Sequence, residues 1–436
     1  MTQYRRNVMG GRFLPRLGFV ARGHGPSCSG AGQTHGRGIV KIGGGTTRWA
    51  LICAPSLVAC AGDSDVADLS ATSWQIDPDP TVSIGREVPF GQVAGAVRLS
   101  SGEIVVADGG LGSARISAFS AEGRYTGLVA RTGEGPGEVQ RPHSLQLGPN
   151  DSLIVFDAGL QRLTVFGPNQ EGLRTESFRP RVGVADGDGL AVVRRLSDTA
   201  WVGLELESPI WGDSPEILRD TVAVLLLDAA LEPSEPLDRV PGAMSTTYLR
   251  QDGRRVLTSP AFAPFAHSAT WGRCLFLSAG EDPSISIYSA GGNLVHQLDG
   301  PGSPRPVEQR HLDGLLEADL QEFPPEYESA ARHRHRVAAR MAYLPYYRQM
   351  IVDEWGHIWL QEYEPPRGLG THWFVVSQSG EHLAEVVMPK PITVYAIGEE
   401  GVLGGTRGHL DEEFVELFPL RRRPSDVSSP LPQCTR

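Results

Sequence analysis

Two segments of the chain follow one pattern: residues 97–125, VRLSSGEIVVADGGLGSARISAFSAEGRY, and residues 145–173, LQLGPNDSLIVFDAGLQRLTVFGPNQEGL. In each segment, an apolar strand meets a polar turn, a second strand ends on an aspartate, and a third strand alternates apolar residues up to a phenylalanine. A repeat of roughly 40–50 residues that contains only strands is typical of a β-propeller blade. The pattern therefore predicts an all-β protein.

The composition agrees with many short strands joined by turns. Glycine and proline number 52 and 33 among 436 residues, without the period of collagen or the bias of low-complexity sequence. The apolar share of 40% is enough for a core, and the length suits one large repeat body.

Runs of alternating apolar residues, broken by Gly, Asp, Asn and Pro, continue along most of the chain. They divide into six blade-like units at residues 91–131, 142–178, 189–237, 265–298, 347–388 and 392–420. We therefore predict a six-bladed β-propeller over residues 81–423. A strand at residues 82–88 precedes the first unit, and we expect it to complete the sixth blade, because an open propeller would expose sheet edges.

One segment does not fit the strand pattern. Residues 307–341 place apolar residues at helical spacing, interrupted by Pro324 and Pro325. We expect a small helical insertion at residues 306–343, between blades 4 and 5. Its second half carries a basic run that either pairs with nearby glutamates on a solvated helix or docks to an acidic partner or anionic lipid. The run contains Arg332, His333, Arg334, His335, Arg336 and Arg340, and the candidate glutamates are Glu317, Glu322, Glu326 and Glu328.

The N-terminal part differs in charge from the rest of the chain. Residues 1–60 hold eight basic and no acidic side chains, which leaves 32 of the 40 basic residues against all 51 acidic ones, a net charge of −19. So acidic a body repels phosphate backbones, and we expect no nucleic-acid partner.

An uncharged apolar stretch, WALICAPSLVA, lies between Arg48 and Cys60. A basic flank, a short apolar run and small residues indicate a secretory signal that is too short to span a membrane. The sequence LVAC, which ends at Cys60, resembles the bacterial lipobox; this implies lipidation of Cys60 and a membrane contact through the lipid anchor only. The alternative is a fortuitous apolar patch in a misassigned upstream region. Residues 1–39 look unlike a signal, and a start nearer Val40 or Lys41 would give the signal an ordinary short basic flank.

These features predict the domain plan. We expect residues 1–60 to be an upstream extension with the signal peptide and lipobox, residues 61–80 a flexible linker, and residues 424–436 a disordered tail. Cys274 and Cys434 could pair in an oxidising compartment, although their separation in space cannot be read from the sequence. We expect a monomer.

Three stretches carry a resemblance to a known family. They are GEGPGEVQRP at residues 133–142, LPYYRQMIVDEWGHIWLQEYEPP at residues 344–366, and VYAIGEEGVLGGTRGHLDEEFVELFPLRR at residues 394–422. They resemble uncharacterised bacterial six-bladed β-propeller proteins related to the NHL-repeat propellers. The resemblance implies an exported or lipid-anchored propeller, and it supplies no catalytic residues.

His143 and His267 each lie at the start of the first strand of a blade, the strand nearest the propeller axis. Side chains from different blades could therefore meet in one central channel. The matching positions elsewhere are predicted to be Ala96, Arg348 and Thr393, which are poor partners for a metal. We take His143, His267 and Arg348 as channel-lining candidates and predict no metal site and no cofactor; a channel metal ion is an unsupported alternative.

Other motifs have structural explanations. Asp108 and Asp157 stand at equivalent turns and are expected to accept backbone hydrogen bonds, with metal binding as the alternative. The glycine-rich residues 133–137 are expected to form a turn between blades, with anion binding as the alternative. Aromatic residues of the fifth blade, such as Trp359 and Trp373, are expected to fill the core.

The sequence contains no G-x-S-x-G, H-E-x-x-H or EF-hand motif, and no catalytic residue is identified. We predict an exported cell-envelope propeller, lipid-anchored or periplasmic or extracellular, that binds a protein, peptide or carbohydrate ligand. The alternative is a propeller enzyme, a lactonase-like hydrolase or a lyase, with a metal site in the central channel. A structural scaffold is the third hypothesis. Whether the protein is an enzyme stays open, with the binding function favoured.

Overall fold

The computed structural model describes residues 74–110, 112–168, 173–177, 190–207, 217–249, 255–322, 328–366, 370–422 and 429–435. These residues belong to one compact unit. The predicted upstream extension, the signal segment and Cys60 lie outside them. No helix in this part of the chain is long and apolar enough to cross a membrane.

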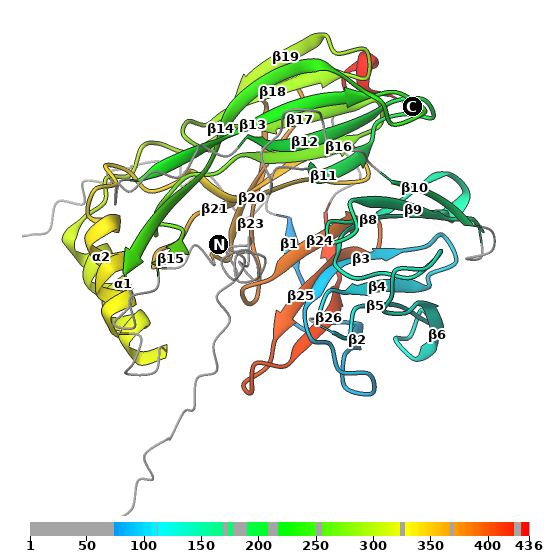
Figure 1. The fold of residues 1–436 in the computed structure, drawn as a ribbon, viewed down its shortest axis with the longest axis horizontal. Coiled ribbons are helices and arrows are strands. Elements are labelled where there is room, and N and C mark those ends of the chain that lie inside the picture. The colour runs from blue at the N-terminus through cyan, green and yellow to red at the C-terminus, as the bar shows by residue number, and fades with distance from the viewer. Residues whose placement is uncertain are drawn as a thin grey trace, which may run out of the picture. The chain divides into compact units, whose positions relative to one another are not determined.

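Six antiparallel sheets contain most of the described strands (Figure 1). The first sheet is β3 (Val93–Arg98), β4 (Ile104–Asp108), β5 (Arg115–Phe119) and β6 (Tyr125–Ala130). The second is β7 (Pro142–Leu147), β8 (Leu153–Asp157), β9 (Arg162–Phe166) and β10 (Leu173–Ser177). The third is β11 (Leu190–Arg195), β12 (Trp201–Glu207), β13 (Leu218–Leu227), β14 (Pro233–Leu249) and β15 (Arg255–Thr258).

The remaining sheets follow the same order along the chain. The fourth is β16 (His267–Trp271), β17 (Cys274–Ser278), β18 (Ser284–Ser289) and β19 (Leu294–Asp299). The fifth is β20 (Tyr347–Val352), β21 (Ile358–Glu362), β22 (His372–Val376) and β23 (His382–Val387). The last is β24 (Thr393–Gly398), β25 (Gly401–Arg407) and β26 (Glu413–Phe418), with β2 (Val82–Ile84) at its edge. A separate ladder pairs β1 (Gln75–Ile76) with β27 (Leu420–Arg421).

An apolar core lies at each junction between consecutive sheets. Val105 of the first sheet and Leu145 of the second belong to one such core. Each later junction likewise has a core with residues from its two sheets. The pairs are Phe156 and Val193 between the second and third sheets, Val202 and Leu275 between the third and fourth, Phe276 and Met350 between the fourth and fifth, and Trp373 and Val402 between the fifth and last. Leu403 of the last sheet and Ile104 of the first also share a core. Second strands such as β4 and β8 are buried along their whole length, because both of their faces are covered. Consecutive antiparallel sheets of four strands, one of them extended to five, form a β-propeller when they pack in this way, so the predicted all-β propeller class is confirmed.

The N-terminal strand joins the last sheet, as the sequence predicted. β2 pairs with β26, with Val82 opposite Leu417 and Ile84 opposite Val415. Val82 and Ile84 are buried and the intervening Ser83 is exposed. The alternation places both apolar side chains in the core between the last sheet and the first. The paired strand is shorter than the predicted residues 82–88.

The third sheet departs most from the prediction. The predicted unit ends at residue 237, whereas β14 continues to Leu249 and a fifth strand, β15, pairs with its far end. Pairing between β13 and β14 shifts register in three places. Proline has no backbone N–H to donate, so Pro236 and Pro241 interrupt the apolar alternation and conceal a long strand in the sequence.

Two glutamine side chains tie first strands together across sheet junctions. Gln146 Nε2 donates to Val193 O at 2.8 Å, and Arg195 N donates to Gln146 Oε1 at 3.2 Å. Gln349 Nε2 donates to Val394 O at 2.6 Å, and Val394 N donates to Gln349 Oε1 at 3.2 Å. Each glutamine amide thus makes the two hydrogen bonds that the backbone of a neighbouring strand would make. These bonds hold β7 against β11 and β20 against β24.

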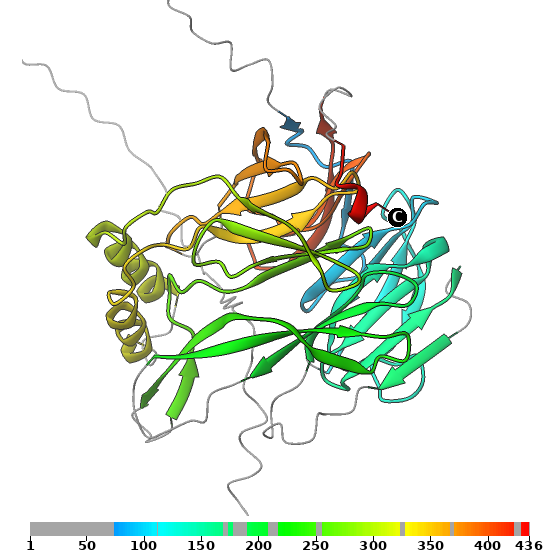
Figure 2. The same cartoon turned by 90° about the horizontal axis from the view of Figure 1, so that it is seen from above.

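Two helices follow β19 and lie side by side in both views (Figure 1, Figure 2). They are α1 (Gln309–Glu322) and α2 (Glu328–Ala338). The ends of this segment are held together by backbone hydrogen bonds from Val307 N to Ala342 O at 3.0 Å and from Leu344 N to Arg305 O at 2.8 Å. The segment therefore leaves and rejoins the sheets at one place.

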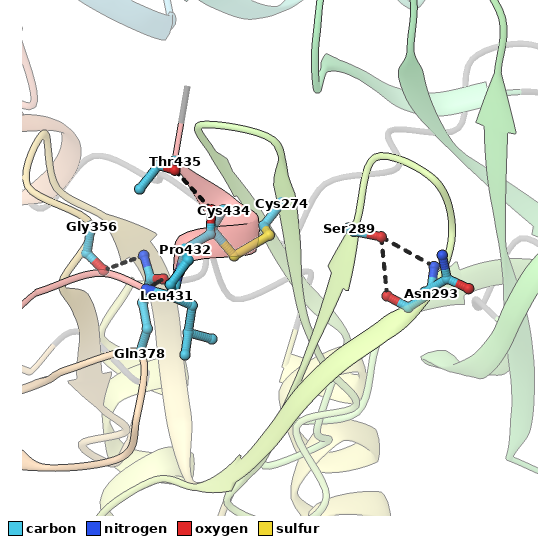
Figure 3. Close-up of a disulfide and its surroundings, with 9 residues drawn as sticks. All are labelled: Cys274, Ser289, Asn293, Gly356, Gln378, Leu431, Pro432, Cys434 and Thr435. Atoms are coloured by element: carbon cyan, nitrogen blue, oxygen red, sulfur yellow. Dashed lines mark hydrogen bonds between the residues drawn. A yellow bond between two sulfur atoms is a disulfide. The ribbon is translucent and has the colours of Figure 1, made fainter.

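A disulfide joins Cys274 of β17 to Cys434 (Figure 3). Gln378 binds the same C-terminal segment, because Leu431 N donates to its Oε1 at 2.9 Å while its Nε2 donates to Gly356 O at 3.1 Å. Residues 429–435 therefore differ from the predicted disordered tail, since the disulfide and these hydrogen bonds hold them. The predicted linker also ends earlier, because Trp74 is buried at 2% exposure in the core between the fifth and last sheets.

Candidate functional site

Five of the six first strands carry a β-bulge near their start. In each of them one residue is skipped when the strand pairs with its neighbour. The skipped residues are Ala94, His143, Ala191, Arg348 and Tyr395. Bulges redirect a side chain away from the ladder and are frequent beside functional sites. Most first strands are neighbours across the sheet junctions, since contacts join β3 with β7, β7 with β11, β16 with β20, β20 with β24, and β24 with β3.

The bulges show where the sequence-predicted candidates lie. His143 and Arg348 are both bulge residues, on β7 and β20. His267 is the first residue of β16, which pairs in regular register. Ala96 and Thr393, the other positions that the sequence matched to the histidines, are paired within their ladders, as His267 is.

His267 is buried at the junction between the fourth and fifth sheets. Its Nε2 lies 3.3 Å from the carbonyl oxygen of Tyr347, and its ring centroid lies 4.6 Å from that of Phe265. A carbonyl can only accept, so Nε2 carries the proton in this contact. Burial and, to a smaller extent, the charge of Arg348 together lower the pKa of His267 to about 4. The imidazole is therefore neutral at pH 7.

Arg348 follows Tyr347 on β20 and adds a positive charge beside Phe265 and His267. Its Cζ lies 5.4 Å from the ring centroid of Phe265. Guanidinium groups at this distance from an aromatic face make a cation–π contact. The same Phe265 ring therefore contacts both His267 and Arg348.

Tyr363 lies close by, after the end of β21. Burial raises the pKa of Tyr363 to about 12, although the nearby charges of Arg348, Arg334 and Arg305 oppose the shift. Its phenol therefore stays protonated at neutral pH. We call His267, Arg348, Phe265 and Tyr363 the strand-start cluster.

The two helices pack directly behind this cluster. Tyr363 and Phe262 share an apolar core with Leu312, Leu315 and Ala338, which come from α1 and α2. This core joins both helices to the loop before β16 and to Tyr363 at the end of the fifth sheet's second strand. The helices therefore pack against the strand-start cluster through Tyr363.

Ion pairs reinforce that attachment. Arg334 Nη1 lies 2.9 Å from Oδ1 of the buried Asp319, which links α2 to α1. Arg305 Nη1 lies 2.8 Å from Glu362 Oε1, and its Nη2 donates to Tyr363 O at 2.7 Å. The basic run of α2 is thus partly paired, as one of the two hypotheses expected. Arg332 pairs with the predicted Glu328, whereas the partner of Arg334 was not among the predicted glutamates.

The structure brings His267 and Arg348 together and places His143 on the second sheet, outside the strand-start cluster. Phe265 and Tyr363 were not predicted as site residues. Phe265 precedes β16 and Tyr363 follows β21, so their proximity to Arg348 depends on contacts between segments that are distant in sequence. Among the described residues, no group of three or more His, Cys, Asp or Glu side chains is arranged to hold a metal ion.

The two repeated aspartates are turn anchors, as predicted. Asp108 Oδ1 accepts hydrogen bonds from the backbone N of Gln92 at 2.9 Å and of Gly110 at 3.0 Å. Asp157 Oδ1 accepts in the same way from Gly159 N at 2.9 Å. Each carboxylate therefore joins the connection that enters its sheet to the turn after its second strand.

The glycine-rich loop is also a turn between sheets. Glu138 Oε2 accepts a hydrogen bond from Gly135 N at 2.8 Å. The loop carbonyl of Glu134 accepts from Arg162 Nη1 at 2.8 Å. The Glu138 carboxylate thus accepts a hydrogen bond from a loop N–H group that a bound anion would otherwise need.

Comparisons with known proteins give only distant likenesses. No family model matches the chain, and no curated protein matches its sequence. A candidate exported protein from Bacteroides fragilis is 10% identical with a TM-score of 0.43, over 83% of this chain and 98% of that one. Regucalcin from Agrobacterium tumefaciens, a calcium-binding protein, is 11% identical with a TM-score of 0.40, over 83% and 99%. Virginiamycin B lyase from Staphylococcus aureus is 9% identical with a TM-score of 0.36, over 80% and 100%. At these TM-scores the likenesses carry no argument, and the fold rests on the strand pairing.

Proposed function

We propose that the protein is an exported β-propeller of six blades that binds a protein, peptide or carbohydrate ligand at the strand-start cluster. Support for six blades comes from the six sheets, the apolar core at each junction and the pairing of β2 with β26. In this proposal residues 306–343 are an insertion between the fourth and fifth blades, and its helices α1 and α2 form one side of the binding region.

The observation that carries the binding function is the contact of Phe265 with both His267 and Arg348. An aromatic ring offers a stacking surface for a sugar or a peptide side chain, and a guanidinium donates several hydrogen bonds. A catalytic base works best when its pKa lies near the operating pH. Because the pKa of His267 is about 4, its neutral ring suits hydrogen bonding better than proton transfer at pH 7.

Export is supported by two independent features. The apolar stretch before Cys60 has the pattern of a lipoprotein signal. The disulfide between Cys274 and Cys434 is the kind of bond that persists in oxidising compartments. We therefore place the protein in the cell envelope, with Cys60 as its lipid attachment site. Cys60→Ala should move the protein from the membrane fraction to the soluble fraction, and unchanged fractionation would exclude the anchor.

Binding can be tested with glycan and peptide arrays probed by the purified protein. We expect a defined set of bound probes for the wild type, and loss of these signals for Arg348→Met. Arg195→Met is the matched control, because Arg195 lies at the far end of a first strand and pairs with the exposed Asp198. An array without wild-type signal, or equal signal for Arg348→Met, would contradict the proposal. Turnover of lactones without array binding would favour the enzyme alternative.

A further inference from the structure

Arg194 lies on a first strand and, among the described residues, no carboxylate forms an ion pair with it. It is the fifth residue of β11, and its Nε is buried and has no hydrogen-bond partner among the described residues. The next residue, Arg195, pairs with Asp198 at the surface. The two arginines are adjacent in sequence but differ in whether their charge is balanced.

The surroundings of Arg194 are apolar. In the ladder it lies opposite Val202, and directly opposed residues share one face of a sheet. Val202 belongs to the core between the third and fourth sheets, together with Leu196, Leu275 and Leu277. Leu196 lies two residues after Arg194, on the same face. Burial in this setting lowers the pKa of Arg194.

A charge in such a place is costly unless something compensates it. A guanidinium keeps its charge at physiological pH, so it cannot escape the cost by losing a proton. An uncompensated buried charge is strongly destabilising, and buried charges in proteins are normally paired. Arg194 is nevertheless partly exposed, so a small solute can reach it.

Two residues with hydroxyl groups lie on the face of β16 that is turned toward the third sheet. Ser268 and Thr270 of β16 lie opposite Leu277 and Leu275. Because these two leucines face the third sheet, their cross-strand partners face it as well. Both residues are partly exposed. His267 occupies the other face of β16, toward the fifth sheet, and does not belong to this group.

We propose that Arg194, Ser268 and Thr270 form a binding site for an oxyanion between the third and fourth sheets. The guanidinium provides two parallel N–H donors that match a carboxylate or a phosphate, and the hydroxyls donate to its remaining oxygens. The site is separate from the strand-start cluster, which lies across β16. A carboxylate-bearing solute and a tetrahedral oxyanion share this chemistry, and the experiment distinguishes them.

The test uses thermal unfolding of the purified protein with sodium acetate, phosphate or sulfate, each against sodium chloride at matched ionic strength. We expect the wild-type Tm to rise with the concentration of the bound anion, because a ligand that binds only the folded state stabilises it. General salt effects act on all variants alike, so the excess rise of the wild type over Arg194→Met isolates the site. An excess rise with acetate identifies a carboxylate site, and an excess rise with phosphate or sulfate a tetrahedral one.

Arg194→Met should fold with equal or higher stability in the absence of the anion, and its Tm should rise only by the general salt effect. Arg195→Met should retain the full wild-type rise. If Arg194→Met does not fold, Arg194→Lys and Thr270→Val replace it, and each should weaken the apparent affinity on the order of tenfold. A wild-type Tm that rises no more with any of the three anions than with chloride, or an equal rise in the Arg194 variants, would overturn the proposal.

Discussion

The imidazole of His267 is held against the backbone of Tyr347, with Nε2 3.3 Å from the carbonyl oxygen. This contact joins the start of β16 to the start of β20, so it connects two sheets at the strand-start cluster. It also places a titratable group where a positive charge is unfavourable. The stability of the fold therefore depends on the protonation of this one residue.

Stability should fall in acid because of His267. Its pKa is about 4 in the folded protein, against an ordinary value of 6.5 for a solvated histidine, so the unfolded chain binds the proton more readily. Below pH 6.5 the unfolded state is favoured progressively, down to about pH 4, and above pH 6.5 the contribution is constant. The full effect is roughly 3 kcal/mol. Urea unfolding of wild type and His267→Phe between about pH 4 and 7 measures it, and the variant should lose this part of the slope.

His409→Asn is the control for that measurement, because His409 is exposed in the turn before β26. Its pH profile should follow the wild type. An identical slope in His267→Phe and the wild type would show that His267 does not carry the effect.

Reduction of the disulfide should destabilise the protein. Cys274 and Cys434 are separated by 160 residues, so the bond restricts the unfolded chain strongly. We expect Cys434→Ser to lower the free energy of unfolding by about 2–5 kcal/mol. Thermal melts with and without a reductant provide the comparison: the wild type should respond to the reductant and the variant should not. A reductant-insensitive wild type would mean that the bond does not form.

The closing strand β2 should contribute much of the stability of the junction between the last sheet and the first. Ile84 is 2% exposed in that core. Ile84→Ala should cost about 2–5 kcal/mol, since it leaves a cavity in a packed core. Denaturant titration measures the loss. Ser83→Ala on the same strand is the control and should cost much less; equal costs would argue against packing as the cause.

The turn anchor Asp157 should be more important than a surface aspartate. It accepts several backbone hydrogen bonds, and its removal leaves those N–H groups without their partner. Asp157→Ala should cost about 2–3 kcal/mol. Asp198→Ala, whose side chain is exposed, should change stability by only about 0.5 kcal/mol. The free energies of unfolding of the two variants at neutral pH decide between these expectations, and equal losses would contradict the anchoring role.

The sequence predicted the features that depend on local pattern. The apolar alternation located the strand units, and the turn role of Asp108 and Asp157 followed from their repeated position. Both of these follow from properties of short segments. The strand near Val82 was assigned to the last sheet by a different argument, because an open edge is unfavourable.

Apart from this closing strand, features that depend on pairing between distant segments were not predicted. The bulges at His143 and Arg348 arise from register, which the alternation of a single strand does not determine. The predicted third unit ended too early, at residue 237, because prolines interrupt the apolar alternation of β14. The buried charge of Arg194 looked like any arginine in a strand, and only its packing against the fourth sheet makes it unusual.

The central claim is that the strand-start cluster binds a ligand, and isothermal titration tests it most directly. The strongest array-bound peptide or glycan would be titrated into wild type, Arg348→Met and Arg195→Met, each checked for an unchanged melting profile. Loss of a charged hydrogen bond and a stacking partner should weaken binding to Arg348→Met by about tenfold or more. Arg195→Met should bind like the wild type. Equal affinity in Arg348→Met and the wild type would contradict the claim.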